Sequence, residues 1–545
     1  MSDGAFDVII IGSGAGGGTL ARRLAPSGKR ILVLERGDWL PREPANWSPA
    51  RVLVDGRYVA AEEWTDGDGR SFAPRVHYVV GGATKLFGAT LHRMRREDFG
   101  EVRHHDGISP AWPVSYEELE PYYSQAEQLY AVHGARGEDP TEPGTSAPYP
   151  FPPVSHEPRI QRLEQDLLNA GLSPFHTPLG LLLREANPGG RGAGVERISP
   201  YSSCVRCSTC DGFPCLVLGK SDAEVLGVRP ALEHSGVTLL TNAHAVRLNT
   251  NPAGTAVTEV VVEHEGHLER YSAALVVVAC GAINSARLLL ASATDRHPGG
   301  LANGSDEVGR NYLHPVRRHL LALSVESHAT VYPHTLSCSD LYFGTTELDH
   351  PLGMIQVGGT VTPESLRGET QVEAQLADGH TPHDVARHAI MFQLSTEDLP
   401  RSENRVMIDA RGRVRVRHTP SNLTPADQLV DLVRGLLPEL GMAPDHLIPL
   451  IAHGRSAPTD VSYQAGTCRF GKDPSSSVLD TDCRAHELDN LYVVDASFLP
   501  SMGAVDPALT VIANALRVGD HLLDRLGAAA RATTAMSTTA VREIP

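Results

Sequence analysis

A glycine-rich loop directly after a β-branched segment is the feature that most constrains the fold of this chain. Residues 6–11 (FDVIII) are long enough for one buried strand of a parallel sheet. The motif Gly12-x-Gly14-x-x-Gly17 follows without a gap. Glycines at this spacing let backbone amides approach a ligand, and a helix that starts here points its positive end at a pyrophosphate. The loop therefore predicts a phosphate-binding strand, loop and helix.

The residues after the loop complete a dinucleotide-binding unit. Residues 19–24 predict the beginning of a helix, and residues 30–34 (RILVL) predict a second strand. Glu35 closes that strand, eighteen residues beyond Gly17, where an acidic side chain accepts hydrogen bonds from a ribose. These elements at this spacing predict an adenine-dinucleotide site.

Two later segments repeat the alternation of strand and helix. Residues 273–280 (AALVVVAC) predict a strand that leads into a helix at 284–291. Residues 490–494 (NLYVV) predict a strand that leads into a helix at 508–523. We therefore expect an α/β sheet that draws its strands from both ends of the chain.

Between residues 315 and 455 the pattern changes to alternating segments that carry Thr and His. Residues 319–327, 405–409 and 413–418 are examples. This alternation is typical of antiparallel strands. The predicted fold class is thus α/β, with a Rossmann-like dinucleotide-binding domain and an inserted α+β domain built on an antiparallel sheet. The final segment, 528–545, is predicted to be a flexible tail.

Composition narrows the classes of partner and location. Lys and Arg number 48 against 65 Asp and Glu, so the net charge of −17 would repel nucleic acid and mildly favours neutral or cationic small molecules. The longest apolar runs are shorter than the roughly 18–20 residues that span a bilayer, so no membrane association is expected. The chain enters a strand at once, without the pattern of a signal peptide, which predicts a cytoplasmic location.

Further motifs identify a family. They are 80–89 (VGGATKLFGA), 112–123 (WPVSYEELEPYY), 466–471 (GTCRFG), 490–497 (NLYVVDAS) and 506–510 (DPALT). Together with the first glycine loop, they resemble the glucose-methanol-choline (GMC) family of flavin oxidoreductases, and the similarity extends along most of the chain. Within that family the sequence is most similar to bacterial sugar and glycoside oxidases and dehydrogenases.

The resemblance implies an FAD enzyme that oxidises an alcohol group on a sugar, glycoside or related polyol. Hydride would pass from the carbinol carbon to flavin N5, and oxygen or another acceptor would reoxidise the flavin. The implied FAD-binding domain comprises 1–110, 200–315 and 456–527, and the implied substrate-binding domain with its connections comprises 111–199 and 316–455. Some relatives carry a flavin-linked His in the second glycine loop. Residues 81–89 contain no His, with Lys85 and Leu86 at that place, so noncovalent FAD is expected.

The resemblance also implies which residues contact FAD. The loop 81–88 is expected beside the isoalloxazine, Asp495 and Ala496 near the pyrophosphate and ribityl chain, and Val246 near the adenine. The full expected set is Gly12, Gly14, Ala15, Gly17, Glu35, Arg36, Gly81, Gly82, Thr84, Gly88, Ala89, Val246, Asp495, Ala496, Pro507 and Leu509.

The two catalytic positions depart from the family pattern. Relatives carry a His base just before the Gly-Thr-Cys-Arg motif and a His or Asn just before Pro-x-Leu-Thr, whereas this chain has Tyr463 and Asp506. A tyrosine with an ordinary pKa near 10 is protonated and a poor base at neutral pH. An aspartate with an ordinary pKa near 3.9 is already ionised and is a weak base unless burial raises its pKa.

Three interpretations of this pair are open. In the first, Asp506 is the base and Tyr463 hydrogen-bonds the substrate oxygen, which preserves alcohol oxidation. In the second, Tyr463 is an acid in different flavin chemistry, such as that of a reductase, lyase or isomerase. In the third, the redox centre is silenced and the chain only binds FAD. His453, ten residues before Tyr463, is a further candidate for the base. His314 is expected to lie behind the residues that contact the cofactor and not to touch the cofactor itself.

Half of the eight cysteines fall within twelve residues. They are Cys204, Cys207, Cys210 and Cys215. This spacing is compatible with Zn or an iron-sulfur cluster, but it is not the ferredoxin pattern. The alternative is a thiol-rich loop over the active-site entrance, either reduced or with one disulfide. We assign no metal to it. The other four cysteines, Cys280, Cys338, Cys468 and Cys483, are predicted to be small core residues.

Overall fold

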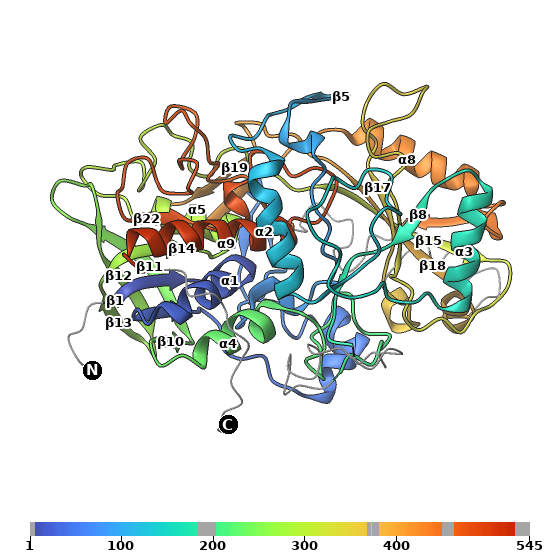
Figure 1. Ribbon diagram of the computed structural model, residues 1–545, viewed down its shortest axis with the longest axis horizontal. Helices are drawn as coiled ribbons and strands as arrows, with labels where there is room; N and C mark the ends of the chain where they lie inside the picture. The colour runs from blue at the N-terminus through green and yellow to red at the C-terminus, as the bar shows by residue number, and fades with distance from the viewer. Residues whose placement is uncertain (1–5, 184–202, 368–371, 373–380, 450–462, 529–545) are drawn as a thin grey trace.

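The computed structural model describes residues 6–183, 203–367, 372, 381–449 and 463–528 (Figure 1). One lobe is built on a five-stranded parallel sheet in the order β10-β2-β1-β14-β22. Its strands are β1 (Phe6–Ile11), β2 (Ile31–Leu34), β10 (Val237–Leu240), β14 (Ala273–Val278) and β22 (Leu491–Val493). The sheet therefore takes strands from both ends of the chain, as the sequence predicts. We call this half the parallel-sheet lobe.

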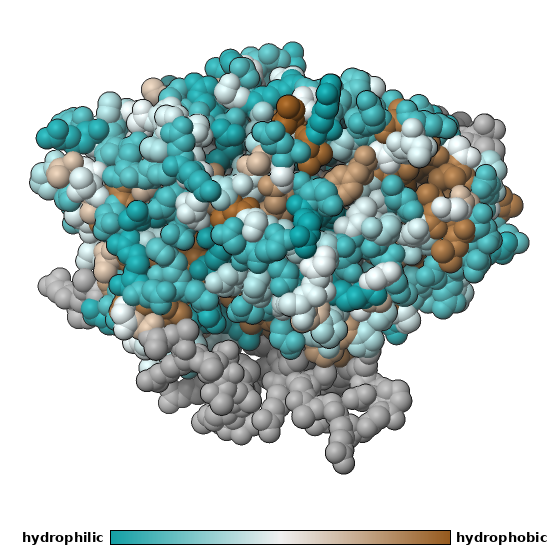
Figure 2. All heavy atoms as spheres, turned by 45° about the horizontal axis from the view of Figure 1, so that its top comes forward, coloured by the Kyte–Doolittle hydropathy of each residue, from teal (hydrophilic) through white to brown (hydrophobic). Residues whose placement is uncertain are grey.

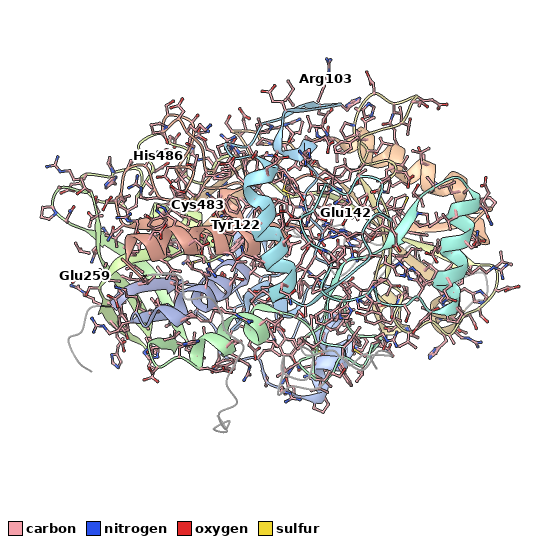
Figure 3. The ribbon with its side chains drawn as sticks, in the orientation of Figure 1. Arg103, Tyr122, Glu142, Glu259, Cys483 and His486 are labelled. Atoms are coloured by element: carbon pink, nitrogen blue, oxygen red, sulfur yellow. The ribbon has the colours of Figure 1, made fainter. Side chains whose placement is uncertain are left out.

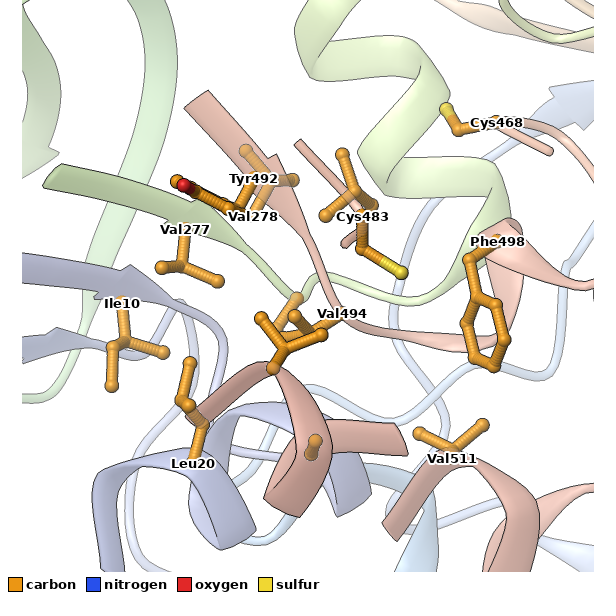
Figure 4. Close-up of a cluster of buried hydrophobic side chains, with 14 of the residues drawn as sticks. Ile10, Leu20, Val277, Val278, Cys468, Cys483, Tyr492, Val494, Phe498 and Val511 are labelled. Atoms are coloured by element: carbon orange, nitrogen blue, oxygen red, sulfur yellow. The ribbon is translucent and has the colours of Figure 1, made fainter. Parts of the chain in front are cut away.

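Apolar side chains from strands and helices make the core of the parallel-sheet lobe. The helix α1 (Ala15–Leu24) contacts α9 (Ala508–Arg525), while α5 (Ala282–Ala291) contacts β11. Figure 4 shows Ile10, Val277 and Val494 facing Leu20 of α1. The β-branched run of β1 is buried because both faces of a parallel sheet are covered. A separate antiparallel sheet comprises β11 (Ala243–Thr250), β12 (Val257–His264) and β13 (His267–Tyr271).

The second lobe is built on a six-stranded antiparallel sheet in the order β21-β15-β18-β17-β16-β8. We call it the antiparallel-sheet lobe. Its strands are β8 (Pro174–His176), β15 (Val316–Ser324), β16 (Leu336–Cys338), β17 (Met354–Val357), β18 (Ala389–Thr396) and β21 (Met442–Pro449). This arrangement confirms the predicted fold class of a Rossmann-like domain with an α+β domain on an antiparallel sheet.

The two faces of this antiparallel sheet have different roles. On one face Leu320 of β15 and Phe392 of β18 pack with α3 (Pro158–Asn169) and α8 (Leu423–Leu436). Figure 1 shows both helices at the outer end of the molecule. Because successive strand residues point to opposite faces, Arg317 and His319 of β15 lie on the other face. That face turns toward the parallel-sheet lobe and meets the cavity described below.

The segments 405–409 and 413–418 do form antiparallel strands, but the expectation that they extend the inserted sheet is wrong. They are β19 (Arg405–Ile408) and β20 (Val414–Arg417), which belong to a four-stranded sheet with β3 (Trp64–Thr65) and β4 (Ser71–Phe72). Val406, Val414 and Val416 are buried in the core of the parallel-sheet lobe. Contact of β19 with α5 explains this placement. We keep the exact domain boundaries as a proposal.

The remaining elements connect the lobes or lie at their edges. They are β5 (Val102–His104), β6 (Gly107–Ser109), α2 (Tyr116–Leu129), β7 (Val132–His133), β9 (Leu179–Gly180), α4 (Arg229–Leu232) and α7 (Pro382–His388). The face in Figure 2 is mostly hydrophilic, with hydrophobic side chains in separate patches. Among the described residues, no helix combines the length and apolar character needed to cross a bilayer.

Candidate active site

A cavity of about 640 Å³ extends from the first glycine loop to the inner face of the antiparallel sheet. Gly12, Gly14 and Glu35 line one end of the cavity. His319 and Gln393 line the other end. Large clefts between two lobes that combine apolar walls with a few converging polar groups are the usual form of cofactor and substrate sites. The cavity is therefore the candidate active site.

The first glycine loop has the geometry of a pyrophosphate cradle. The helix α1 begins after Gly14 without a side-chain cap and without an acidic residue in its first turn, so its amide groups and positive end face the cavity. Gly12 has a φ of 102°, and a Cβ at Gly16 would lie 2.1 Å from the Val494 carbonyl oxygen. A side chain at either position would collide with the backbone at the ends of β14 and β22, so the glycines let α1 begin close against the sheet, as a dinucleotide-binding loop requires.

Two buried carboxylates hold the loops around the cradle. Glu35 accepts hydrogen bonds from the Ser13 amide (3.1 Å) and hydroxyl (2.6 Å) and from the Gly37 amide (2.9 Å). Asp495 accepts hydrogen bonds from the Gly281 amide (3.0 Å) and the Ser285 hydroxyl. Burial raises the pKa of both carboxyl groups. Both side chains line the cavity, so they are placed to meet a ribose or its neighbouring groups as well as to order the loops.

The second glycine loop packs against the first. Gly81 donates from its amide to the Ser13 hydroxyl at 3.0 Å, and a Cβ at Gly82 would lie 3.0 Å from Gly14 Cα. Lys85, at the place of the flavin-linked His in some relatives, is 2% exposed and pairs with Asp222 (2.9 Å) and Glu224 (2.6 Å). These two carboxylates raise the pKa of Lys85 against the effect of burial. The Lys85 amine is thus a buried structural cation.

Most of the predicted cofactor residues line this cavity. They are Gly12, Gly14, Ala15, Glu35, Arg36, Gly82, Thr84, Gly88, Val246, Asp495, Ala496 and Pro507. Gly17, Gly81, Ala89 and Leu509 do not line it. A Cβ at Gly17 would lie 2.0 Å from the Gly12 carbonyl oxygen, so this glycine serves the turn itself. Leu509 is fully buried in the hydrophobic core behind the cavity.

Tyr463 and Asp506 both line the cavity, and Arg317 of β15 contacts both of them without lining it. The Arg317 guanidinium forms an ion pair with the Asp506 carboxylate, and its Cζ lies 3.7 Å from the centre of the Tyr463 ring. The Arg317 side chain is only 4% exposed and that of Asp506 is 15% exposed. Asp506 also comes directly before Pro507, the N-cap of α9, whose positive end faces the same region. A cation therefore lies against both unusual residues.

Arg317 and other polar residues of the inner sheet face are not predicted by any sequence motif. His319 of β15 and Gln393 of β18 are register partners, and both line the cavity. Asp211, from the cysteine-rich loop, lines it as well. Arg317 and His319 are two positions apart in β15 and therefore share a face, but Arg318 stands between them, so the strand sequence VRRHLLALS has no polar alternation that marks this face.

The other histidine candidates gain no support from the structure. His453 falls outside the described residues. His314 is half-buried and donates its backbone amide to Asp398 (3.3 Å), and it is not among the residues that line the cavity.

The four clustered cysteines surround one small cavity of about 10 Å³, and all eight cysteines are free thiols. Burial raises the pKa of Cys204 to about 11 and that of Cys210 to about 12. Cys483, labelled in Figure 3, is a buried core residue as predicted, like Cys338 and Cys468. Cys280 is a partial correction, because it is half-buried and lines the large cavity.

Comparison with known proteins decides the family. The chain matches the GMC oxidoreductase N-terminal profile over residues 6–316 and the C-terminal profile over residues 358–515. It belongs to the GMC oxidoreductase family. The resemblance inferred from the motifs is thereby confirmed, and with it an FAD-dependent oxidoreductase that acts on alcohol groups.

Individual GMC relatives cover nearly the whole chain. The 6'''-hydroxyparomomycin C oxidase of Streptomyces lividus is 30% identical over 97% of this chain and 93% of its own length. The paromamine 6'-oxidase of Streptomyces fradiae is 30% identical over 94% of this chain and 91% of its own length. The structure of pyridoxine 4-oxidase from Mesorbium loti has a TM-score of 0.64 at 19% identity, covers 95% of this chain and 99% of its own, and supports the fold.

Proposed function

We propose that this GMC enzyme oxidises a hydroxyl group of a sugar or glycoside, including aminoglycosides, with Asp506 as proton acceptor and Tyr463 as hydrogen-bond donor to the substrate oxygen. The observation that carries the proposal is the contact of Arg317 with both residues, through an ion pair to Asp506 and a stack on the Tyr463 ring. Two of the relatives are named as oxidases of aminoglycosides, which brings that substrate class into the proposal.

The cluster offers a solution to the missing histidine base. When bound, FAD supplies the acceptor for the hydrogen that leaves the carbinol carbon. Loss of the hydroxyl proton builds negative charge on the substrate oxygen. Arg317 and the N-terminal end of α9 put positive charge beside that oxygen, and preorganised charge of this kind lowers the strength of base that the reaction needs. Asp506 then receives the proton, while the stacked guanidinium keeps the Tyr463 ring in place.

The first test is the anaerobic visible spectrum of the purified holoenzyme. We expect loss of the flavin absorption with at least one member of a panel of sugars, glycosides and aminoglycosides, with paromamine included. The variant Asp506→Ala should reduce flavin at least about 100-fold more slowly with the same compound, because a positioned acid or base contributes about 10²–10⁴-fold. A variant that reduces flavin at the parent rate would remove Asp506 from the proposed role.

The proposal extends to the mode of FAD binding and to the cell compartment. No His lies in residues 81–89, and the Lys85 amine is held by Asp222 and Glu224, so we propose noncovalent FAD. We further propose a small-molecule partner, oxygen or another electron acceptor, and a cytoplasmic location without membrane contact. The net charge of −17 disfavours contact with anionic membrane surfaces, which supports the absence of membrane contact.

A further inference from the structure

The carboxylate of Asp211, in the cysteine-rich loop, lies at the end of the cavity that His319 and Gln393 line. We call this the substrate end. Asp211 lines the cavity beside Gly212 and Phe213, on the wall that also carries Gly359 and Gln393. The sequence motifs give it no role, and the proposed reaction does not use it. Its surroundings show how firmly the side chain is placed.

Two glycines make room for this carboxylate. A Cβ at Gly88 would lie 3.0 Å from Asp211 Oδ1, and a Cβ at Gly359 would lie 2.9 Å from Asp211 Cβ. Gly88 belongs to the second glycine loop, and Gly359 follows β17 of the antiparallel-sheet lobe. Asp211 therefore sits where the loop expected beside the isoalloxazine meets the wall of the substrate end.

A buried lysine fixes the backbone around Asp211. The Lys220 amine, in a residue that is 1% exposed, donates to the carbonyl oxygens of Phe87 (2.7 Å), Cys210 (2.8 Å) and Phe213 (2.8 Å). The Gly212 amide donates to the Leu86 carbonyl oxygen at 2.9 Å. These bonds tie the residues on both sides of Asp211 to the second glycine loop. The carboxylate is thus preorganised, which reduces the entropy cost of binding a ligand.

The charge of Asp211 is not matched by a cation within the described part of the chain. Its Oδ2 accepts a hydrogen bond from the neutral Gln393 amide at 2.9 Å, and no described Arg, Lys or His nitrogen forms a salt bridge with it. Burial lowers the pKa of the nearby His334 to about 4, so that imidazole is neutral at pH 7. Asp506, by contrast, is already paired with Arg317. The Lys220 ammonium is engaged by the backbone carbonyls of the same loop, so within the described residues no cation forms a salt bridge with Asp211, and this carboxylate can accept a cationic group of a ligand.

We propose that Asp211 binds the ammonium group of an amino-sugar substrate. This inference rests on the proposed function, since the ligand must be the molecule that is oxidised. A partly buried anion with a neutral hydrogen-bond donor on one oxygen matches a primary ammonium, which has three donors and one positive charge. A neutral sugar hydroxyl would satisfy the hydrogen bond but not the charge, so Asp211 selects aminated over neutral sugars.

The test compares glucosamine with glucose on the oxidised holoenzyme, by calorimetric binding and by anaerobic flavin reduction. We expect tighter binding of glucosamine by the parent enzyme. The variant Asp211→Asn should weaken glucosamine binding at least about tenfold and leave glucose binding within about twofold, because Asn keeps the size and one acceptor but loses the charge. Asp431→Asn is the matched control, since it removes one charge at an exposed site on α8.

The outcomes separate this inference from the proposed function. Suppose that both sugars reduce the flavin of the parent and of Asp211→Asn, and that each sugar binds both proteins with the same dissociation constant. This result would overturn the ammonium site and leave the oxidation of sugars intact. An equal loss of affinity for glucose and glucosamine in Asp211→Asn would also overturn it. Asp211 would then bind sugars in general or only stabilise the loop. A holoenzyme that no sugar, glycoside or aminoglycoside reduces would refute the proposed function itself, and the calorimetric difference would still report on Asp211.

Discussion

Replacing Arg317 by methionine should nearly stop flavin reduction while the folded holoenzyme persists. The change removes the guanidinium that pairs with Asp506 and stacks on Tyr463, but it keeps a long side chain in the strand. Breaking a buried ion pair by removing one partner costs about 3–5 kcal/mol, and a cation over an aromatic ring contributes about 0.5–2 kcal/mol. Because Asp506 keeps some contact with solvent, we take the lower end, about 3 kcal/mol.

That figure is a cost in stability; the rate falls by the part of the interaction specific to the transition state, and removing one preorganised donor to a developing oxyanion typically costs about 100- to 1,000-fold. The assay is anaerobic stopped-flow reduction of the flavin by the best substrate of the panel. Arg317→Lys should give an intermediate rate, because it keeps a charge but loses the planar fork and the stack.

Arg318→Met is the control for this prediction. Arg318 is the next residue of β15, points to the opposite face, and pairs with Asp427 at a half-exposed site. We expect its rate within about twofold of the parent. Parent-like flavin reduction in Arg317→Met would refute the reasoning, because the cation would then have no part in proton transfer. Equal damage from both arginine changes would indicate a general effect on the strand.

Two further predictions concern the cofactor and the stability of the chain. Methanol precipitation of the holoenzyme should release all FAD into the supernatant, and flavin that stays with the pellet would contradict the noncovalent mode inferred from Lys85 and residues 81–89. For Asp98, full burial and then the charge of Glu397 raise the pKa to about 7, above the ordinary 3.9. Its stabilising contribution is therefore complete below pH 4 and lost as the pH rises through 7. The parent should lose up to about 4 kcal/mol of unfolding free energy over that window, and Asp98→Asn should show a flatter profile in urea unfolding at pH 5 and pH 8.

The parts of the fold that depend on local chain geometry could be predicted from the sequence. The first glycine loop, the strand before it and the helix after it lie where the pattern places them, because a strand, a tight turn and a helix are specified by neighbouring residues. The alternation at 405–409 and 413–418 also predicted antiparallel strands, which β19 and β20 are. Their sheet partners were not predicted, since the contact of β19 with α5 depends on segments more than a hundred residues away.

In the candidate site, too, the residues next to a motif could be predicted and the others could not. Tyr463 and Asp506 are marked by the motifs beside them, whereas Arg317 belongs to a strand without a motif and Asp211 to the cysteine motif, whose spacing points to thiol or metal chemistry and not to a carboxylate. The roles proposed for them depend on the antiparallel sheet and the cysteine-rich loop coming together around one cavity, which the sequence does not specify locally. Alternation in β15 places Arg317 on one of two faces, but it does not tell which face is turned to the cavity.

The replacement of both catalytic residues makes physical sense when Arg317 is counted with them. A tyrosine and an aspartate alone would leave an uncompensated carboxylate and a poor base in place of the usual histidine. With Arg317, the carboxylate is paired and the tyrosine ring is held, and in the proposed function this fixed cation would lie beside the oxygen on which charge develops. The positive charge that a protonated histidine carries only after it has taken the proton is here present throughout the reaction. This arrangement fits alcohol oxidation better than a silenced centre, because a buried, preorganised cation against both substituted residues is what stabilisation of a developing oxyanion requires.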